Sequence, residues 1–289
     1  MAIVEPIIRP PSEAESFLLQ VTVGCSANDC TFCGAYFNKP FAIKDFEEIA
    51  SDIERGAALY PQTRRAFLLD GDALVVNNTR LLLVLEKLNK AFPMLSRISS
   101  YANGYNIVRR TDEELKELYD HKLQLIYIGL ESGNQDILDH CRKRSRAEEM
   151  IEAVRKSGRA KIKSSVIVLL GLGGKRYSVW HIKDTITALN RMQPRYLSFL
   201  SLMVIPGTPL YEEVRNGDFE ELNPVELLKE AHDIILGLQL DKTVFRCNHA
   251  SNYFPLAGRF PQDKERLLDS LRLALSGELK LRPEFLRGL

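Results

Sequence analysis

Short runs of apolar residues recur along the first two thirds of the chain, and amphipathic stretches separate them. The runs are continuously apolar rather than alternating, which is typical of strands buried on both faces of a parallel sheet. We therefore predict strands at Phe17–Val23, Ala66–Asp70, Arg97–Ala102, Leu123–Leu130, Ser164–Leu172 and Tyr196–Ile205.

The stretches between these runs repeat their apolar positions with a helical period of about 3.6 residues. Thr111 followed by Glu114 is typical of a capping box at a helix start. We expect His181 to lie at the start of the helix after Gly174, and Trp180 to have a packing role. The predicted helices cover Lys44–Leu59, Asn78–Phe92, Thr111–Lys122, Asn134–His140, Ala147–Gly158 and His181–Met192.

Strands that alternate with helices predict a parallel α/β fold, either an open doubly wound sheet or a barrel. From about Asn216 the pattern changes to two helices, Val225–Leu240 and Lys264–Gly277, around an irregular piece at Phe245–Asp263. The sequence has no linker or low-complexity tract, so we predict that this helical segment belongs to the same domain.

Composition is that of an ordinary folded protein, with 45% hydrophobic and 27% charged residues. A net charge of +1 gives no overall field for a nucleic-acid backbone, so nucleic-acid binding is not favoured. The N-terminal stretch lacks the apolar core of a signal peptide, and no run of about 18 apolar residues occurs. We expect a cytoplasmic protein without a membrane partner, whose thiols are reduced.

Three of the five cysteines, Cys25, Cys30 and Cys33, fall in one loop after the first predicted strand. The carboxyl ends of parallel strands are where such folds place their chemistry. Three thiolates select zinc or an iron–sulfur cluster over magnesium or calcium. A closed zinc site needs a fourth ligand, but the first histidine is His121, and Cys141 and Cys247 are isolated. We favour a cluster with one open position, and a structural zinc or sensor cluster is the alternative.

This loop resembles the signature of the radical S-adenosylmethionine (radical SAM) enzymes. The usual spacing in that family is C-x3-C-x2-C, whereas this chain has C-x4-C-x2-C. The resemblance implies a [4Fe–4S] cluster whose open iron binds SAM, and an electron donor such as flavodoxin or ferredoxin. SAM is then cleaved to methionine and a 5′-deoxyadenosyl radical. It also implies that Phe32 packs near the adenine.

Further segments resemble the branch that contains the methylthiotransferases, the Elongator catalytic subunit and the oxygen-independent coproporphyrinogen oxidase. FLLDGDAL stands where the family has Gly-Gly-Glu-Pro, with Asp70 in place of a glycine. The resemblance gives Asp72 the acidic role toward SAM; a helix-capping aspartate is the alternative. IGLESG and the basic run Arg142–Arg146 add two further contacts with SAM, through Glu131 and Lys143. A solvated basic face is the alternative explanation of that run. The residues implied to bind SAM are Gly71, Asp72, Asn103, Glu131, Lys143, Ser165, Val168, Gly171 and Met203.

The substrate is expected at the same mouth, beside Tyr101 and the polar segment Cys247–Tyr253. We predict His249 as an acid or base, Cys247 as a hydrogen-atom donor, and Tyr101 as a third catalytic residue. A structural loop, in which His249 and Asn252 bond backbone groups, is the alternative.

The resemblance implies an α/β fold, a partial (β/α)₆ TIM-like barrel with a mainly helical C-terminal extension. We predict an N-terminal extension at 1–16, the radical SAM barrel at 17–215, and a segment at 216–289 that closes part of the mouth. No auxiliary-cluster, cobalamin-binding or RNA-binding appendage is expected. The predicted activity is hydrogen abstraction from a small-molecule substrate, and modification of RNA or a protein is the alternative.

Overall fold

The computed structural model describes residues 3–36 and 38–288, and its chain divides into two compact units. Unit 1 comprises Met1–Asp29, Cys33–Ile128 and Lys156–Ser164. Unit 2 comprises Cys30–Phe32, Gly129–Arg155 and Ser165–Leu289. Strand β6 (Leu123–Glu131), strand β7 (Lys163–Leu170) and helix α6 (Ala147–Arg159) each contribute residues to both units.

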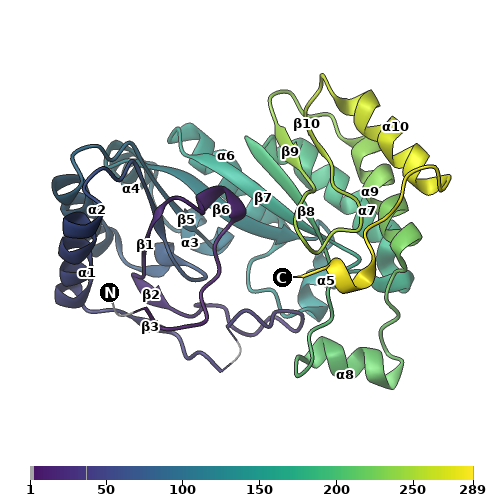
Figure 1. Cartoon of the computed structure of the whole chain (residues 1–289), viewed down its shortest axis with the longest axis horizontal. Coiled ribbons are helices and arrows are strands. Elements are labelled where there is room, and N and C mark those ends of the chain that lie inside the picture. Colours follow the sequence, from purple (N-terminus) through teal and green to yellow (C-terminus); the bar gives the residue numbers. More distant parts are fainter. Residues whose placement is uncertain (1–2, 37, 289) are drawn as a thin grey trace. The chain divides into compact units, whose positions relative to one another are not determined.

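Unit 1 is a parallel sheet in the order β1, β4, β5, β6, with helices on one side (Figure 1). The apolar faces of its helices bury residues such as Ile49, Ile53, Leu81 and Leu85. A two-stranded antiparallel ribbon, β2 with β3, follows β1. The elements are η1 (Pro11–Glu13), β1 (Phe17–Leu19), β2 (Thr22–Val23), β3 (Ala42–Ile43), α1 (Phe46–Leu59), β4 (Arg65–Leu68), η2 (Ala73–Val75), α2 (Asn78–Ala91), β5 (Arg97–Tyr101), α3 (Gly104–Val108) and α4 (Asp112–Asp120).

Unit 2 continues the same alternation, with β8 parallel to β7, β9 parallel to β8, and β10 antiparallel to β9. Helices α9 and α10 pack against each other, and α10 also packs against β10 (Figure 1). The remaining elements are α5 (Gln135–His140), α7 (Gly174–Met192), β8 (Tyr196–Ser201), α8 (Pro209–Asn216), α9 (Pro224–Gly237), β9 (Val244–Arg246), β10 (Ala257–Arg259), α10 (Lys264–Leu275) and η3 (Glu284–Leu286).

All six predicted strands are present, with shifted ends. The first predicted strand is divided into β1, which pairs with β4, and β2, which pairs with β3; the Gln20 side chain between them bonds both to Val4 and to Asp70. The capping box at Thr111 and Glu114 is confirmed. Strands β9 and β10 lie in the segment predicted to be irregular, so the C-terminal segment is not helical throughout.

One prediction on helix α7 is wrong. The helix begins at Gly174, so His181 lies within it and is completely buried rather than at its start. Trp180 is 53% exposed and packs against the tilted ring of Tyr177, at 5.9 Å between ring centroids.

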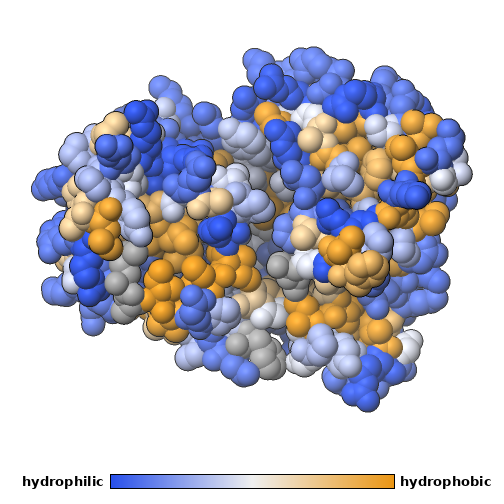
Figure 2. Space-filling model, in the orientation of Figure 1, coloured by the Kyte–Doolittle hydropathy of each residue, from blue (hydrophilic) through white to orange (hydrophobic). Residues whose placement is uncertain are grey.

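Apolar side chains are exposed on part of unit 1. Val4, Ile8, Phe41 and Ile43 are each about 40% exposed, and Figure 2 shows hydrophobic residues gathered over the β2–β3 ribbon. In the described part of the chain, no helix is both long and apolar enough to span a bilayer.

Candidate functional site

The three clustered cysteines differ from the two isolated ones in their exposure. Cys25, Cys30 and Cys33 are partly exposed, whereas Cys141 and Cys247 are buried. Burial raises the pKa of Cys141 and of Cys247 to about 12, so both stay protonated near neutral pH. The accessible thiols are therefore the ones that the sequence predicted as ligands.

No group of three or more His, Cys, Asp or Glu side chains within residues 3–36 and 38–288 is arranged to hold a single metal ion. Each thiolate of a [4Fe–4S] cluster binds a different iron atom, so cluster ligands need not converge on one point.

The backbone of Gly71 lies so close to Cys25 that there is no room for a side chain at position 71. Its N–H donates to the Gly24 carbonyl oxygen at 3.1 Å. A Cβ atom at Gly71 would lie 2.6 Å from both the Cβ and the Sγ of Cys25. The loop after β4 is thus packed directly against the first thiol, which is what a shared ligand site requires.

Asp72 carries a buried acceptor without a partner. Its Oδ2 accepts from Ser26 Oγ at 2.9 Å, Asn103 Nδ2 at 3.1 Å and Asn106 Nδ2 at 2.5 Å. Its Oδ1 is buried and has no hydrogen-bond partner among the described residues. Burial raises the pKa of Asp72, and the amide and hydroxyl donors oppose that rise.

Asp72 lies at the N-cap of η2 but makes no side-chain capping bond, so the capping interpretation is wrong. Its donors belong to the loop after Gly24 and to the loop and helix after β5, which fixes the carboxylate in one orientation. Asn106 was missed in the sequence, because it lies inside the short helix α3, where no motif marks it.

Tyr36 is a second residue that the sequence did not indicate. It is 5% exposed, and burial raises its pKa first, with Asp70, Tyr101, Cys25 and Cys33 adding to the rise. Tyr101, predicted as catalytic, packs its ring edge-on against Phe67, at 5.3 Å between centroids. Unit 1 therefore gathers two tyrosines near two of the three predicted ligands.

In unit 2, Glu131 and Lys143 form an ion pair. Lys143 Nζ lies 3.0 Å from Glu131 Oε1, and the two side chains are only 11% and 13% exposed. A Cβ atom at Gly129 would lie 2.0 Å from Glu131 Oε1 and 3.1 Å from Lys143 Nζ, so that glycine leaves the space for the pair. Glu131 ends β6 with φ of +59°, a strained value for a non-glycine residue.

The family comparison agrees with this geometry. The family model described as "Radical SAM superfamily" matches residues 19–189, more than half of the chain. The chain belongs to the radical SAM superfamily. Comparison with curated proteins gives no match. Membership of this superfamily implies a [4Fe–4S] cluster and SAM as cofactors.

Solved structures of radical SAM enzymes share its fold. Methylornithine synthase (PylB) is 11% identical over 80% of this chain, with a TM-score of 0.55. Coproporphyrinogen III oxidase (HemN) from Escherichia coli is 13% identical over 76%, with a TM-score of 0.56. The Elp3 of Methanocaldococcus infernus is 14% identical over 91%, with a TM-score of 0.54. This radical SAM chain covers 63%, 51% and 63% of their respective lengths. The predicted partial TIM-like barrel is confirmed.

The radical SAM protein has its predicted adenine-binding residues along β7 and after β8. Gly171 follows β7 with φ of +83°, and its N–H donates to Glu230 Oε1 at 2.6 Å. Ser165 and Val168 are 5% and 0% exposed, whereas Met203, after β8, is partly exposed. Phe32 is partly buried against the apolar cluster around Leu202 and Leu210. Their contacts with SAM stay predictions.

A buried polar chain in unit 2 connects two of these segments. His181 Nδ1 lies 2.8 Å from Ser132 Oγ, directly after Glu131. His181 Nε2 lies 3.6 Å from Glu230 Oε1, which accepts from the Gly171 N–H. Helices α7 and α9 thus fix the turn after β6 and the turn after β7 together.

We expect His181 to make stability depend on pH. Burial lowers the pKa of His181 below 6.5, although Glu230 and Asp184 oppose that change. The unfolded state therefore binds the proton more readily, and stability falls as pH drops below about 6.5, by at most about 1.4 kcal/mol per pH unit. Urea unfolding of wild type and of His181→Asn between pH 7.5 and 5 measures this, and parallel curves would contradict it.

The segment Cys247–Tyr253 is held mainly by structural bonds. Asn252 Nδ2 donates to the Phe199 carbonyl oxygen at 2.8 Å, and Asn252 Oδ1 accepts from Ser201 Oγ at 2.9 Å. His249 Nδ1 accepts from the Ser251 N–H at 3.1 Å, and burial lowers the pKa of His249. For Asn252 the structural alternative is confirmed; the catalytic roles of His249 and Cys247 stay predictions.

Two arginines near the C-terminus tie this segment down. Arg282 Nη1 donates to the carbonyl oxygens of Ala250 and Asn252, at 2.8 and 3.1 Å. Arg287 donates to Ser251 O through Nε at 2.7 Å, and to Leu202 O through Nη2 at 3.0 Å. Its guanidinium also lies 4.1 Å from the centroid of the Tyr253 ring.

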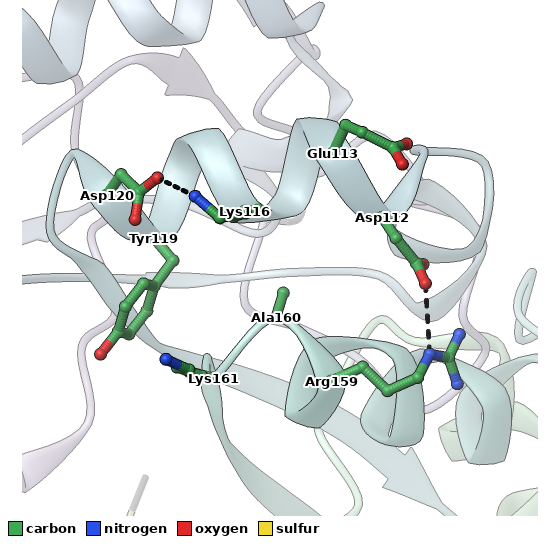
Figure 3. A pocket seen from close by; sticks show the side chains of 8 residues that line it. All are labelled: Asp112, Glu113, Lys116, Tyr119, Asp120, Arg159, Ala160 and Lys161. Carbon is green, nitrogen blue, oxygen red and sulfur yellow. Dashed lines mark hydrogen bonds and ion pairs between the residues drawn. The ribbon is translucent and has the colours of Figure 1, made fainter.

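A surface pocket of about 300 Å³ lies elsewhere in unit 1, between α4 and the end of α6 (Figure 3). Its charged groups neutralise one another, with Lys116 bonded to Asp120 at 2.7 Å and Arg159 to Asp112 at 3.3 Å. None of its lining residues is a predicted site residue, so we do not assign the reaction to it.

Proposed function

We propose that Cys25, Cys30 and Cys33 hold the [4Fe–4S] cluster of this radical SAM enzyme. Two neighbouring residues carry this proposal. Gly71 lies in close contact with Cys25, and the next residue, Asp72, has a buried Oδ1 without a hydrogen-bond partner among the described residues. When bound, the cluster supplies the electron that cleaves SAM to methionine and a 5′-deoxyadenosyl radical. Flavodoxin or ferredoxin is the class of electron donor that we propose.

The residues of this chain bind and orient SAM. Asp72 Oδ1 offers a buried acceptor to the ammonium group of SAM, and Asn103 and Asn106 hold that carboxylate in place. Glu131 and Lys143 offer one acceptor and one cation in a largely buried pair. Because these groups are screened from water, each contributes more to orientation than an exposed group would.

We propose a small molecule as the substrate, which gives up a hydrogen atom, with Tyr101, His249 and Cys247 as the catalytic residues. His249, whose pKa is lowered by burial, is the acid or base of the proposal. The protonated Cys247 thiol can donate a hydrogen atom to a substrate radical, which leaves a Cys247 thiyl radical; one electron from the proposed electron donor and one proton from water restore the thiol.

Anaerobic reconstitution followed by an assay of 5′-deoxyadenosine tests this function. We expect about four iron and four sulfide per chain, and more 5′-deoxyadenosine when an extract of cell metabolites is added. Stoichiometric zinc without iron would overturn the proposal. RNA retention that weakens with salt, together with stimulation by RNA alone, would favour a nucleic-acid substrate instead.

Asp72→Asn tests the proposed contact with SAM. The loss of a charge-assisted hydrogen bond should weaken SAM binding about ten- to a hundredfold, while the amide keeps the shape of the side chain. Equilibrium dialysis with reconstituted protein measures the dissociation constant. An unchanged constant at wild-type iron content would remove Asp72 from the site.

A further inference from the structure

Asp70 occupies a backbone conformation that suits glycine. Its φ is +66°, in the left-handed region, where aspartate is tolerated at a cost. The residue is 0% exposed and lies between β4 and Gly71. Its side chain must therefore make contacts that outweigh the backbone strain and the burial of a carboxylate.

The Asp70 carboxylate is completely engaged. Oδ2 accepts from Gln20 Nε2 at 2.7 Å and from the Gly24 N–H at 3.0 Å. Oδ1 accepts from Lys39 Nζ at 3.0 Å. One carboxylate therefore ties the end of β4 to the residue that directly precedes Cys25.

Lys39 is its buried partner. Besides Asp70, Lys39 Nζ donates to the carbonyl oxygens of Val4 and Pro6, both at 2.8 Å, which uses all three ammonium protons. The Lys39 and Asp70 side chains are 3% and 0% exposed. The ammonium also lies 5.5 Å from the centroid of the Tyr36 ring.

Two paths of contacts connect the Asp70–Lys39 ion pair to the proposed cysteine ligands. The first runs from Asp70 to Gly24 and Cys25, where Gly71 leaves room for the thiol. The second runs from Lys39 to the buried ring of Tyr36, 5.5 Å from Lys39 Nζ, and Asp70, Cys25 and Cys33 all contribute to the raised pKa of Tyr36 after the larger effect of burial. Positive and negative charge are therefore balanced within the shell that supports the cysteine loop.

We propose that the buried Asp70–Lys39 pair positions Cys25 and balances the protein charge beside the cluster, so that its two members shift the reduction potential in opposite directions. This inference rests on the proposed function. Net charge and hydrogen bonds near a cluster are known determinants of its potential. One-electron reduction, with dithionite as the donor, adds one negative charge to the cluster. The Lys39 ammonium therefore favours the reduced form, and the Asp70 carboxylate disfavours it.

The test compares midpoint potentials of reconstituted full-length protein without SAM, followed by electron paramagnetic resonance during a redox titration. Lys39→Met should lower the potential and Asp70→Asn should raise it. The double variant Lys39→Met/Asp70→Asn should return close to the wild-type value. Shifts of the two single variants in the same direction, or no shift in either, would overturn the inference.

Lys44 and Asp52 provide a matched control. They form another buried pair in unit 1, with Lys44 Nζ 2.9 Å from Asp52 Oδ2 and side chains 4% and 3% exposed. Lys44→Met and Asp52→Asn should destabilise the fold comparably but leave the potential unchanged. Shifts equal to those at Asp70 and Lys39 would mean that the pair near Cys25 has no special role.

If a single variant fails to assemble the cluster, the midpoint potentials of two other variants still test the inference. The double variant keeps no unpaired buried charge, and Lys39→Arg keeps the positive charge, so both should retain the wild-type potential; a shift in either would overturn the inference. If wild type itself assembles no cluster, the proposed function fails. If wild type holds a cluster but the opposite shifts are missing, only this inference fails.

Discussion

Replacement of Cys30 by alanine is expected to reduce 5′-deoxyadenosine formation to the background of a mixture without protein. Two thiolates would remain to hold a cluster that needs three protein ligands and one open iron. Iron content per chain should fall together with product. Anaerobic reconstitution, iron analysis and chromatography of 5′-deoxyadenosine measure both quantities.

Cys141→Ala is the control for this variant. Cys141 is 0% exposed, and burial raises the pKa of its thiol to about 12, so it should not bind iron. The variant should keep wild-type iron content and product, apart from a modest loss of stability. If Cys30→Ala still cleaved SAM at the wild-type rate, the assignment of the cluster to this loop would be wrong.

A single methyl group at Gly71 should have the second largest effect. In Gly71→Ala the new Cβ would lie 2.6 Å from the Cβ and Sγ of Cys25, so the thiol or the loop must move. Overpacking of this kind costs about 1–3 kcal/mol, and the displacement falls on a predicted ligand. We expect a stable protein that binds less iron and forms little 5′-deoxyadenosine.

Gly158→Ala is the matched substitution. Gly158 lies in α6, and a Cβ atom there would meet nothing within 4 Å. Alanine favours a helix by about 1 kcal/mol over glycine, so this variant should be at least as stable as wild type and fully loaded with iron. Equal iron loss in both variants would show that the distance between Gly71 and Cys25 is irrelevant.

The sequence predicted the part of the fold that local patterns determine. The continuously apolar run at Leu123–Leu130 gave strand β6, which is buried on both faces over most of its length. The run at Tyr196–Ile205 also gave a strand, β8, although β8 alternates between buried and partly exposed positions. Strands β9 and β10 were missed because each has three residues and alternates in exposure. Each forms through pairing with a neighbour distant in sequence or in the same segment: β9 pairs with β8, and β10 pairs with β9.

The residues of the candidate site likewise divide into those that local sequence signals indicate and those that only the fold reveals. Cysteine spacing and the carboxylates at strand ends are local signals, so Cys25, Asp72 and Glu131 could be selected without a structure. Asn106, Tyr36 and Glu230 could not, because each reaches its partners only through the fold. Asp70 was interpreted as a departure from the family pattern, and only its bonds to Lys39 and Gly24 explain why a carboxylate is there.

The fastening of Cys247–Tyr253 by Arg282 and Arg287 has a consequence for folding during synthesis. The bonds join residues about 30 to 85 positions apart, from Asn252 to Arg282 and from Leu202 to Arg287. Synthesis runs from the N-terminus, so both arginines leave the ribosome after the segment that they hold. A ribosome-bound chain that ends before Arg282 can already pair β7, β8 and β9, but its polar loop would have nothing to close against. The segment proposed to meet the substrate is thus completed after the sheet that carries it.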